Sequence, residues 1–259
     1  MKKEVTVAVI GCGTIARSAH LPSYSENPMA KIKYVVDIIP EKAREMAEKY
    51  NVPNISTDYR DVLKDDEVEA ISICTPNATH APIAIDCLKA GKNVLCEKPA
   101  SVTADLAKQM KDAADQSGKI LNIGVVNRFN AAVNHIKDMI SAGELGNVYH
   151  IYCSFRSHRS IPGLGGWFTT KDISGGGVLI DWGVHFLDLI FYCLNPVDLV
   201  SVSSSAYSEL AKNMKDYTFV DMWAGPPDYN GVYDVEEMVT GLIRTTGPTI
   251  SFNGAWAQN

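Results

Sequence analysis

The sequence predicts an α/β protein, in which a doubly wound parallel sheet is followed by an α+β domain with a mainly antiparallel, open sheet. Residues 4–124 alternate short β-branched apolar runs with longer stretches of helical periodicity, and this alternation is typical of βαβ units. After residue 124 it ends, and three later runs place apolar and polar residues in turn, as antiparallel strands do. These patterns predict one domain over residues 1–125 and a second over 126–259.

The first domain contains five predicted strands and five predicted helical segments. The strands are expected at residues 5–10, 32–36, 70–74, 93–96 and 120–124. The helices are expected at 15–25, 40–50, 80–90 and 104–117, with a shorter segment near 59–63. Because crossovers between parallel strands are right-handed, these elements form a doubly wound sheet with helices on both faces.

The second domain mixes two predicted helices with four predicted strands. The helices are expected at about 131–142 and 177–194, and the strands at 146–155, 199–207, 235–244 and 249–256. If the chain is complete, its second sheet should be short and expose an edge, which another subunit or a terminal segment would cover. If it is a fragment, the missing part holds further strands and substrate contacts.

The composition is that of a globular protein and argues against several classes of partner. Of 259 residues, 46% are hydrophobic and 21% are charged, and 24 Lys and Arg stand against 30 Asp and Glu, for a net charge of −6. Because no basic cluster stands out, nucleic acid is not expected as a partner. No run approaches eighteen consecutive apolar residues and no signal-peptide core follows Met1, so we expect neither a membrane partner nor secretion.

The cysteines are scattered and form no C-x-x-C pair. They are Cys12, Cys74, Cys87, Cys96, Cys153 and Cys193. This spacing excludes the usual zinc-ribbon and thioredoxin patterns, and we expect no metal site. Several cysteines lie in apolar runs, which favours buried, reduced thiols and therefore the cytoplasm.

A glycine-rich motif follows the first predicted strand and opens the first predicted helix. Gly11, Gly13 and Ala16 fit the pattern G-x-G-x-x-A, with Thr14 and Ile15 between the last two. Gly11 permits the tight turn, Gly13 lets backbone N–H groups approach a pyrophosphate, and Ala16 allows close packing of helix on sheet. The alternative is a glycine-rich turn without a ligand, but the strand-turn-helix context favours a dinucleotide.

Asp37 strengthens the dinucleotide interpretation. It follows the second strand, 24 residues after Gly13, where an acidic side chain can accept hydrogen bonds from the adenosine ribose. A carboxylate there repels a 2′-phosphate, so we expect NAD rather than NADP. Lys42 and Arg44 are near enough to keep NADP as the alternative.

Four further motifs occur in order along the chain. They are Thr75-Pro76-Asn77 followed by His80, Cys96-Glu97-Lys98-Pro99, Asn127-Arg128-Phe129, and Gly175-Gly176-Gly177 continuing through Asp181 to His185. Together with the glycine motif they cover about three quarters of the chain and resemble the glucose-fructose oxidoreductase, inositol dehydrogenase and rhizopine catabolism family (Gfo/Idh/MocA).

The resemblance implies a Rossmann domain, a second domain with an open antiparallel sheet, and an active site between them. It implies hydride transfer between NAD or NADP and a hydroxyl-bearing carbon of a sugar, cyclitol or related polyol. Lys98 would lie at the nicotinamide and polarise the reacting oxygen, while Asp181 and His185 would contact substrate and act as acid and base. We also expect a homo-oligomer, a dimer or tetramer, formed through the C-terminal sheet.

The residue chemistry agrees with these roles. Asp181 and His185 are four positions apart on a predicted helix, so both side chains project from one face. An imidazole accepts the hydroxyl proton readily at neutral pH, and Lys98 stabilises a developing alkoxide. A solvent-facing helix pair, with a contribution of about 0.2 to 0.5 kcal/mol, is the alternative, but the surrounding apolar residues argue against it.

Other positions are assigned less sharply. The cofactor set comprises Gly11, Gly13, Thr14, Ile15, Asp37, Thr75, Pro76, Asn77, His80, Glu97, Lys98 and Asn127. A plain turn explains Asn77 almost equally well, and His80 is expected to be structural rather than catalytic. Arg128 is a candidate for substrate or for an interdomain salt bridge, and Trp167 and Lys171 are candidates for the pocket wall.

Three other functions stay open. One is a regulatory or non-catalytic subunit that binds NAD without turnover. Another is an enzyme whose NAD oxidises a sugar only transiently, to drive glycoside cleavage, elimination or epimerisation. A dihydrodiol or biliverdin-type reductase is also compatible with the resemblance.

Overall fold

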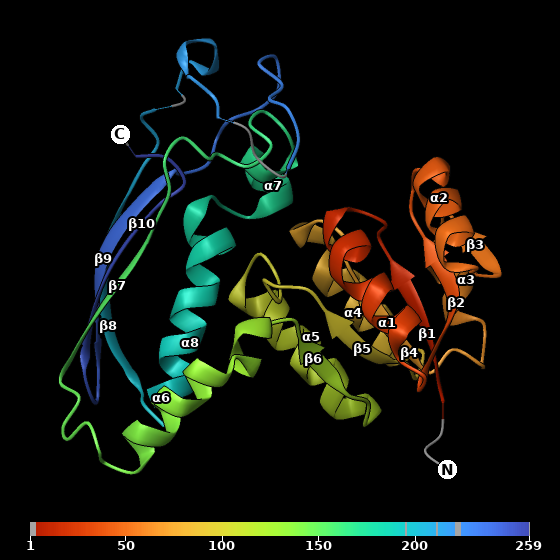
Figure 1. Cartoon of the computed structure of the whole chain (residues 1–259), viewed down its shortest axis with the longest axis horizontal. Coiled ribbons are helices and arrows are strands. Elements are labelled where there is room, and N and C mark those ends of the chain that lie inside the picture. Colours follow the sequence, from red (N-terminus) through yellow and green to blue (C-terminus); the bar gives the residue numbers. More distant parts are fainter. Residues whose placement is uncertain (1–3, 195, 211, 221–223, 259) are drawn as a thin grey trace. The chain divides into compact units, whose positions relative to one another are not determined.

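A computed structural model describes residues 4–194, 196–210, 212–220 and 224–258 (Figure 1). The chain divides into two compact units, residues 1–124 and 125–259, which are described separately below as the first and second unit.

The first unit is built on a six-stranded parallel sheet. Its strands are β1 (Val5–Ile10), β2 (Ala30–Val36), β3 (Asn54–Ser56), β4 (Ala70–Ile73), β5 (Asn93–Cys96) and β6 (Leu121–Ile123). The strand order β3-β2-β1-β4-β5-β6 is the order of a dinucleotide-binding doubly wound sheet, which confirms the predicted fold class. The sequence reading missed β3, because three residues are too few to show a periodicity.

Helices cover both faces of this sheet. They are η1 (Ala16–His20), α1 (Leu21–Glu26), α2 (Pro40–Tyr50), α3 (Arg60–Leu63), η2 (Asn77–Thr79), α4 (His80–Lys89) and α5 (Ala104–Ser117). Local sequence sets their ends. Pro40 opens α2, the Thr103 hydroxyl accepts from the Leu106 N–H at the start of α5, and Gly118 ends α5 with φ +65°.

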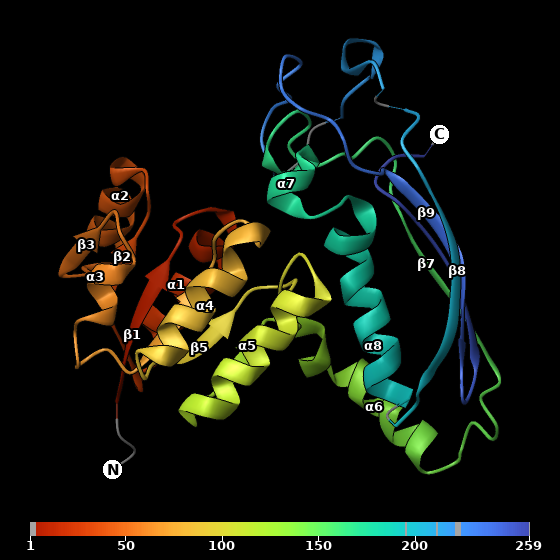
Figure 2. The same ribbon diagram turned by 180° about the vertical axis from the view of Figure 1, so that it is seen from behind.

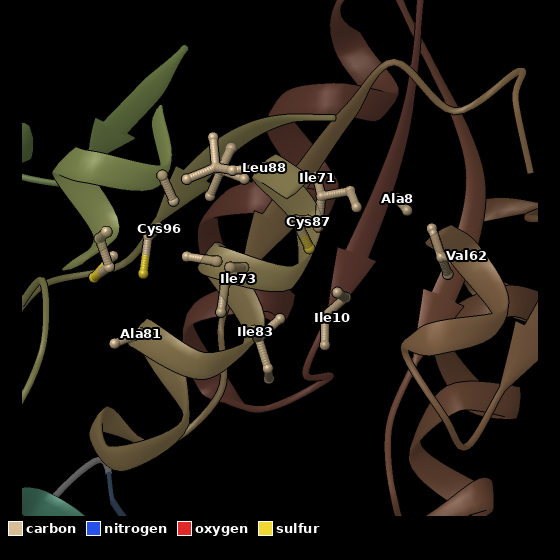
Figure 3. Close-up of a cluster of buried hydrophobic side chains, with 14 of the residues drawn as sticks. Ala8, Ile10, Val62, Ile71, Ile73, Ala81, Ile83, Cys87, Leu88 and Cys96 are labelled. Carbon is tan, nitrogen blue, oxygen red and sulfur yellow. The ribbon is translucent and has the colours of Figure 1, made fainter. Parts of the chain in front are cut away.

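Alternate strand residues enter two separate cores. On one face Ala8, Ile10 and Ile73 pack with side chains from α3, α4 and α5, as Figure 3 shows. On the other face Val9 and Val35 pack with side chains from η1, α1 and α2. The two cores explain why apolar residues dominate the central strands β1, β4 and β5.

The second unit contains a four-stranded sheet in the order β7-β10-β9-β8. The strands are β7 (His150–Arg156), β8 (Leu199–Tyr207), β9 (Met238–Thr245) and β10 (Thr249–Ala255). β10 pairs antiparallel with β9, β9 pairs antiparallel with β8, and β10 runs parallel to β7. The mainly antiparallel prediction is confirmed, with one parallel pair that the sequence pattern did not reveal.

The helical segments of the second unit are η3 (Val126–Phe129), α6 (Ala131–Ser141), η4 (Trp167–Thr169), α7 (Lys171–Ser174), η5 (Leu179–Gly183), α8 (Val184–Leu194) and η6 (Met214–Asp216). Of these, α8 lies along one face of the sheet (Figure 2), and side chains of η5 and α8 belong to its core. The inward side chains of the sheet, Phe155, Val239 and Phe252 among them, form one core with Leu187 and Phe191 of α8.

The stretch Lys171–Leu194 is the one described helical stretch that is long and apolar enough to cross a membrane. Its apolar residues Leu187, Ile190 and Phe191 pack against the core of the second unit. The stretch also carries Asp181 and Asp188. In its most apolar window, 22% of the stretch is buried.

Strand β8 lies at one edge of the second sheet, and all of its residues are exposed. Leu199, Val200 and Val202 are each about 60% exposed, at 62%, 63% and 58%. Strand β7 lies at the other edge of the sheet.

Candidate functional site

The glycine-rich loop follows β1. Gly11 has φ +91°, and a Cβ there would lie 2.6 Å from the Cys74 carbonyl oxygen, so the turn requires glycine. Around Gly13, by contrast, no heavy atom lies within 4 Å of the position of a Cβ. Thr14 and Ile15 are exposed, while Ala16 is fully buried against the sheet. The loop therefore has open space above Gly13, at the start of a helix, where a pyrophosphate fits.

Asp37 stands beside this loop, directly after β2. One carboxylate oxygen accepts the Cys12 N–H at 2.8 Å and the other accepts the Ile39 N–H at 2.9 Å. Because a carboxylate oxygen has two lone-pair sites, each oxygen can accept a further bond from a ribose hydroxyl. Arg44, which sequence reading kept as a basis for NADP, pairs with Glu41 at 3.3 Å.

The loop after β4 carries Thr75, Pro76 and Asn77. Thr75 and Pro76 are half-buried and Asn77 is 7% exposed. The Thr79 hydroxyl lies 2.7 Å from the Pro76 carbonyl oxygen and 2.7 Å from the Thr75 hydroxyl, which closes the loop into a turn. Backbone groups of the loop stand at the carboxyl edge of the sheet, where doubly wound folds bind ligands.

His80 lies under this loop and is 1% exposed. Its Nδ1 is 2.7 Å from the Pro99 carbonyl oxygen, and its Nε2 is 2.8 Å from the Thr75 carbonyl oxygen. Burial lowers the pKa of His80, and the two backbone hydrogen bonds oppose this shift. The imidazole thus joins the loops after β4 and β5, and any effect on a cofactor passes through those loops.

Lys98 follows β5 and is half-buried. Its backbone N–H donates to the Oε2 atom of Glu97 at 3.1 Å. The Oε1 atom of Glu97 lies 2.7 Å from the Nε2 atom of His20. Sequence reasoning missed His20, which lies on the helix after the glycine loop.

In the second unit, Asp181 and His185 lie on one continuous helical stretch, as predicted. Asp181 belongs to η5, a wide π-helical turn, and is 5% exposed. Its Oδ2 atom accepts the indole N–H of Trp256 at 3.1 Å. His185 is half-buried in the first turn of α8, and its Nδ1 lies 3.5 Å from the side-chain amide nitrogen of Asn127. Asn127, assigned to the cofactor from the sequence, is therefore placed at His185.

Glu236 anchors the start of this helix. Its carboxylate accepts the N–H groups of Gly177 at 3.0 Å and Leu179 at 3.2 Å, and its carbonyl oxygen accepts the Val178 N–H at 3.0 Å. These bonds satisfy donors that a helix start leaves without partners. A Cβ on Gly177 would lie 1.8 Å from that carbonyl oxygen, so the approach of the two segments requires glycine.

Three candidate substrate residues have other contacts. Arg128 forms a two-bond ion pair with Asp188, at 2.8 and 2.5 Å, and lies over the ring of Tyr192. Arg128 thus forms a salt bridge, which was one of its two predicted roles. Both partners lie in the second unit, so the salt bridge does not join two domains. Trp167 stacks on Phe168 and is 38% exposed. The backbone N–H of Lys171 donates to Oδ1 of Asp234 at 2.7 Å, and the residue is exposed.

Across the described ranges, no three His, Cys, Asp or Glu side chains gather where they could hold a metal ion.

Comparison with known families decides the classification. Residues 5–125 match the family model described as an oxidoreductase family with an NAD-binding Rossmann fold, and residues 133–259 match the GFO/IDH/MocA C-terminal domain. The chain belongs to the Gfo/Idh/MocA oxidoreductase family. Its first unit is thus the NAD-binding Rossmann fold of this family, as the glycine motif and Asp37 predicted.

Curated relatives in the Gfo/Idh/MocA family include sugar and cyclitol dehydrogenases. The chain is 31% identical to D-glucoside 3-dehydrogenase of Escherichia coli (strain K12) over 237 residues, which are 92% of this chain and 66% of that protein. It is 28% identical to scyllo-inositol 2-dehydrogenase (NAD(+)) of Bacillus subtilis (strain 168) over 224 residues, 85% of this chain and 63% of the relative. The chain spans about two thirds of the length of these relatives.

Among solved structures, GenD2 from gentamicin A biosynthesis in complex with NAD is similar, with a TM-score of 0.84 and 26% identity. The match covers 99% of this chain and 67% of GenD2. GenD2 thus supplies an example of this Gfo/Idh/MocA fold solved with NAD.

Proposed function

We propose that this Gfo/Idh/MocA chain acts as an NAD-dependent dehydrogenase, which oxidises a secondary hydroxyl of a sugar, cyclitol or related polyol. One observation carries the proposal: Asp181, buried and held by an indole N–H, precedes a half-buried histidine by one helical turn. A fixed carboxylate and an imidazole on one helix face are suited to remove the proton of a hydroxyl group by general base catalysis. The relatives named above are dehydrogenases of a glucoside and of an inositol.

The first unit fits NAD through its backbone. Space is open over Gly13, a helix begins at Thr14, and Asp37 is fixed where ribose hydroxyls would lie. When bound, NAD supplies the hydride acceptor. Asp37 favours NAD over NADP because a carboxylate repels a 2′-phosphate. Thr75, Pro76 and Asn77 would line the nicotinamide half with their backbone.

His185 would accept the hydroxyl proton. For Nε2 to act as the base, Nδ1 must carry the ring proton, and Asn127 would accept that proton through its amide oxygen. The oxygen and nitrogen of an amide have nearly the same shape, so a 180° rotation of the Asn127 amide provides this arrangement. Asn127 would then hold the imidazole in the basic tautomer.

Lys98 would act through its charge. As the proton leaves, negative charge develops on the substrate oxygen, and an ammonium group stabilises it. Asp181 would orient the substrate and stabilise the imidazolium that forms. These three residues carry the proposed catalysis, and Arg128, Trp167 and Lys171 are the less sharply assigned candidates for substrate contact.

The test begins with the nucleotide. Denaturation of the purified protein, with mass analysis of the released material, should yield NAD, and a screen of glycosides, sugars and inositols should show substrate-dependent NADH absorbance. Product without net NADH would favour transient oxidation in place of dehydrogenation. NAD binding without any product would favour a regulatory subunit. A protein that neither contains nor binds a dinucleotide would refute the proposal.

We further propose that the protein is a cytoplasmic homo-oligomer. All six cysteines are free thiols, and five of them are buried, which suits a reducing compartment. The sheet of the second unit exposes Tyr152, at 63%, on its face away from the core, and this face would form the contact between copies. Sedimentation should show a dimer or tetramer, and Tyr152→Glu should dissociate it. A monomeric wild-type chain would contradict this arrangement.

A further inference from the structure

Four side chains of the first unit form a continuous line that ends at Lys98. The Tyr24 hydroxyl lies 2.6 Å from the Ser72 hydroxyl, which lies 3.3 Å from Nδ1 of His20. Nε2 of His20 lies 2.7 Å from Oε1 of Glu97, and Oε2 of Glu97 accepts the Lys98 N–H at 3.1 Å. The line joins the adjacent segments η1 and α1 to β4 and to the end of β5, which lie at least 44 residues later in the sequence.

The line is largely shielded from water. Ser72 is 1% exposed, and the side chains of His20 and Glu97 are 8% and 16% exposed. Polar groups in such a place need partners, because an unsatisfied buried group costs about 1 to 3 kcal/mol. Each of the four side chains has a hydrogen-bond partner in the next group of the line, and for Glu97 this partner is the backbone N–H of Lys98.

The protonation state of Glu97 fixes the direction of its hydrogen bond with His20. Burial raises the pKa of Glu97, but the hydrogen bond and charge of His20 and the contacts with Lys98 outweigh burial, so the pKa lies below its ordinary value. Glu97 is then an ionised acceptor, and Nε2 of His20 must donate to it. Burial raises the pKa of Tyr24, so its hydroxyl keeps its proton. Nδ1 of His20 accepts from Ser72 when the ring is neutral and donates to Ser72 when the ring is protonated, and Nε2 donates to Glu97 in both cases.

Glu97 is also restrained from its other side. A Cβ on Gly124 would lie 3.2 Å from both carboxylate oxygens, so the end of β6 packs closely against the carboxylate. Glu97 is therefore confined to one position, with one carboxylate oxygen bonded to His20 and the other to the Lys98 N–H. Beyond Lys98, the Pro99 carbonyl oxygen is held by His80. The backbone at Lys98 is thus fixed on both sides.

We propose that His20 is a positioning residue for Lys98, and that it acts through Glu97. The imidazole fixes the carboxylate, the carboxylate fixes the Lys98 N–H, and the ammonium group is thereby directed to one place. The effect of His20 on turnover rests on the proposed function, whereas its effect on the Lys98 side chain does not.

The test compares His20→Phe, which removes the donor, with His20→Gln, whose amide can still donate to Glu97. Tyr59→Phe is the matched control, because it removes another side-chain bond to a carboxylate of the same unit, from the Tyr59 hydroxyl to Asp86 at 2.6 Å. The lysines are labelled as ¹³C-dimethylamines for NMR, and the Lys98 signal is assigned by its loss in Lys98→Arg.

In His20→Phe the Lys98 signal should move and broaden, whereas in Tyr59→Phe it should match the wild type. His20→Gln should restore most of the original signal. An unmoved signal in folded His20→Phe would overturn the proposal. If that variant does not fold, Ser72→Ala takes its place, because it removes the hydrogen bond between Ser72 and His20 with little change in the size of the core, and the Lys98 signal should again move.

Turnover supplies the second readout. His20→Phe should lower kcat about tenfold or more, because small displacements of a catalytic group are costly, while KM and the Kd of NADH change less than about twofold. His20→Gln should recover most of kcat. A moved Lys98 signal with unchanged kcat would overturn the catalytic part of the proposal. A wild type without NADH binding or turnover would instead refute the proposed function, and the Lys98 signal would still test the effect of His20.

Discussion

Trp256 donates its indole N–H to Asp181 from a position 75 residues later in the chain. The distance from Nε1 to Oδ2 is 3.1 Å, and the two residues are 0% and 5% exposed. The indole follows β10 directly and belongs to the core of the second unit. A packed aromatic ring on a strand end therefore fixes the direction of a carboxylate on the helix opposite.

Replacing this indole tests its effect on Asp181. Trp256→Phe keeps an aromatic ring in the core but removes the donor, so Asp181 loses one hydrogen bond in a buried place. We expect the free energy of unfolding to fall by about 1 to 3 kcal/mol, and kcat to fall more than KM changes. Thermal unfolding followed by circular dichroism and steady-state kinetics measure both. Tyr233→Phe is the control, since it also removes an aromatic hydrogen-bond donor from a buried carboxylate of the second unit, that of Glu237. Equal effects of the two variants would contradict a special role of Trp256.

His185→Ala tests the proposed base. Loss of a positioned acid-base group lowers kcat by about a hundredfold or more, while the affinity for NAD should stay nearly unchanged. The readouts are NADH formation and a fluorescence titration with NADH. His150→Ala is the control, because His150 is exposed on β7 of the same unit. Full activity of His185→Ala would remove this residue from the mechanism.

Asp37→Ala tests how the ribose is recognised. The variant loses the carboxylate that would bind the ribose hydroxyls and repel a 2′-phosphate, so NAD should bind more weakly and the discrimination against NADP should shrink. Asp58→Ala is the matched control, since Asp58 also accepts a backbone N–H two residues later, at 2.9 Å from Arg60 N. An unaltered ratio of the NAD and NADP Kd values in Asp37→Ala would show that another group reads the ribose.

Gly13→Val tests the open space over the glycine loop. Because no heavy atom lies within 4 Å of the Cβ position, the fold should accept a side chain there with little loss of stability. The same side chain would occupy the space proposed for the pyrophosphate, so dinucleotide binding should be abolished. Binding by calorimetry and melting temperature separate the two effects. Retained binding in a folded Gly13→Val protein would disprove the loop assignment.

The sequence predicted the elements of the first unit well, and the reason is physical. The central strands β1 and β4 are largely buried on both faces, and the helices α2 and α5 are amphipathic, so both sequence patterns are strong there. In the second unit β7 and β9 begin at His150 and Met238, later than the expected 146 and 235, because the alternating pattern extends beyond the paired residues. The periodicity of apolar residues shows which side chains point toward the core. Hydrogen-bonded pairing with a neighbouring strand decides where a strand begins.

Side-chain partners could not be predicted in the same way. His20 and Glu97 are 77 residues apart, and Trp256 and Asp181 are 75 apart. Spacing along the chain carries no signal for such pairs, because the fold alone brings them together. Local patterns therefore indicated Lys98 and Asp181 as candidates, while their hydrogen-bond partners emerged only from the three-dimensional structure.

The last prediction concerns the pKa of Glu97 in His20→Phe. Without His20, the hydrogen bond and charge that lower this pKa are lost, and burial, which raises it, becomes dominant. Titration of the carboxyl carbon by ¹³C NMR, assigned through Glu97→Gln, should therefore move from below the ordinary value of about 4.3 to above it. His150→Phe, in the second unit, should leave this titration unchanged.

The shift also fixes the sign of a stability effect. In the wild type the folded pKa of Glu97 is depressed, so its contribution to the free energy of unfolding is present above about pH 4.3 and is lost as the pH falls through the folded pKa. In His20→Phe the folded pKa is raised, so the same carboxyl destabilises the folded state at neutral pH, and this penalty disappears as the pH falls through the raised value. A Glu97 pKa that stays depressed in His20→Phe would show that Lys98, and not His20, keeps this carboxylate ionised.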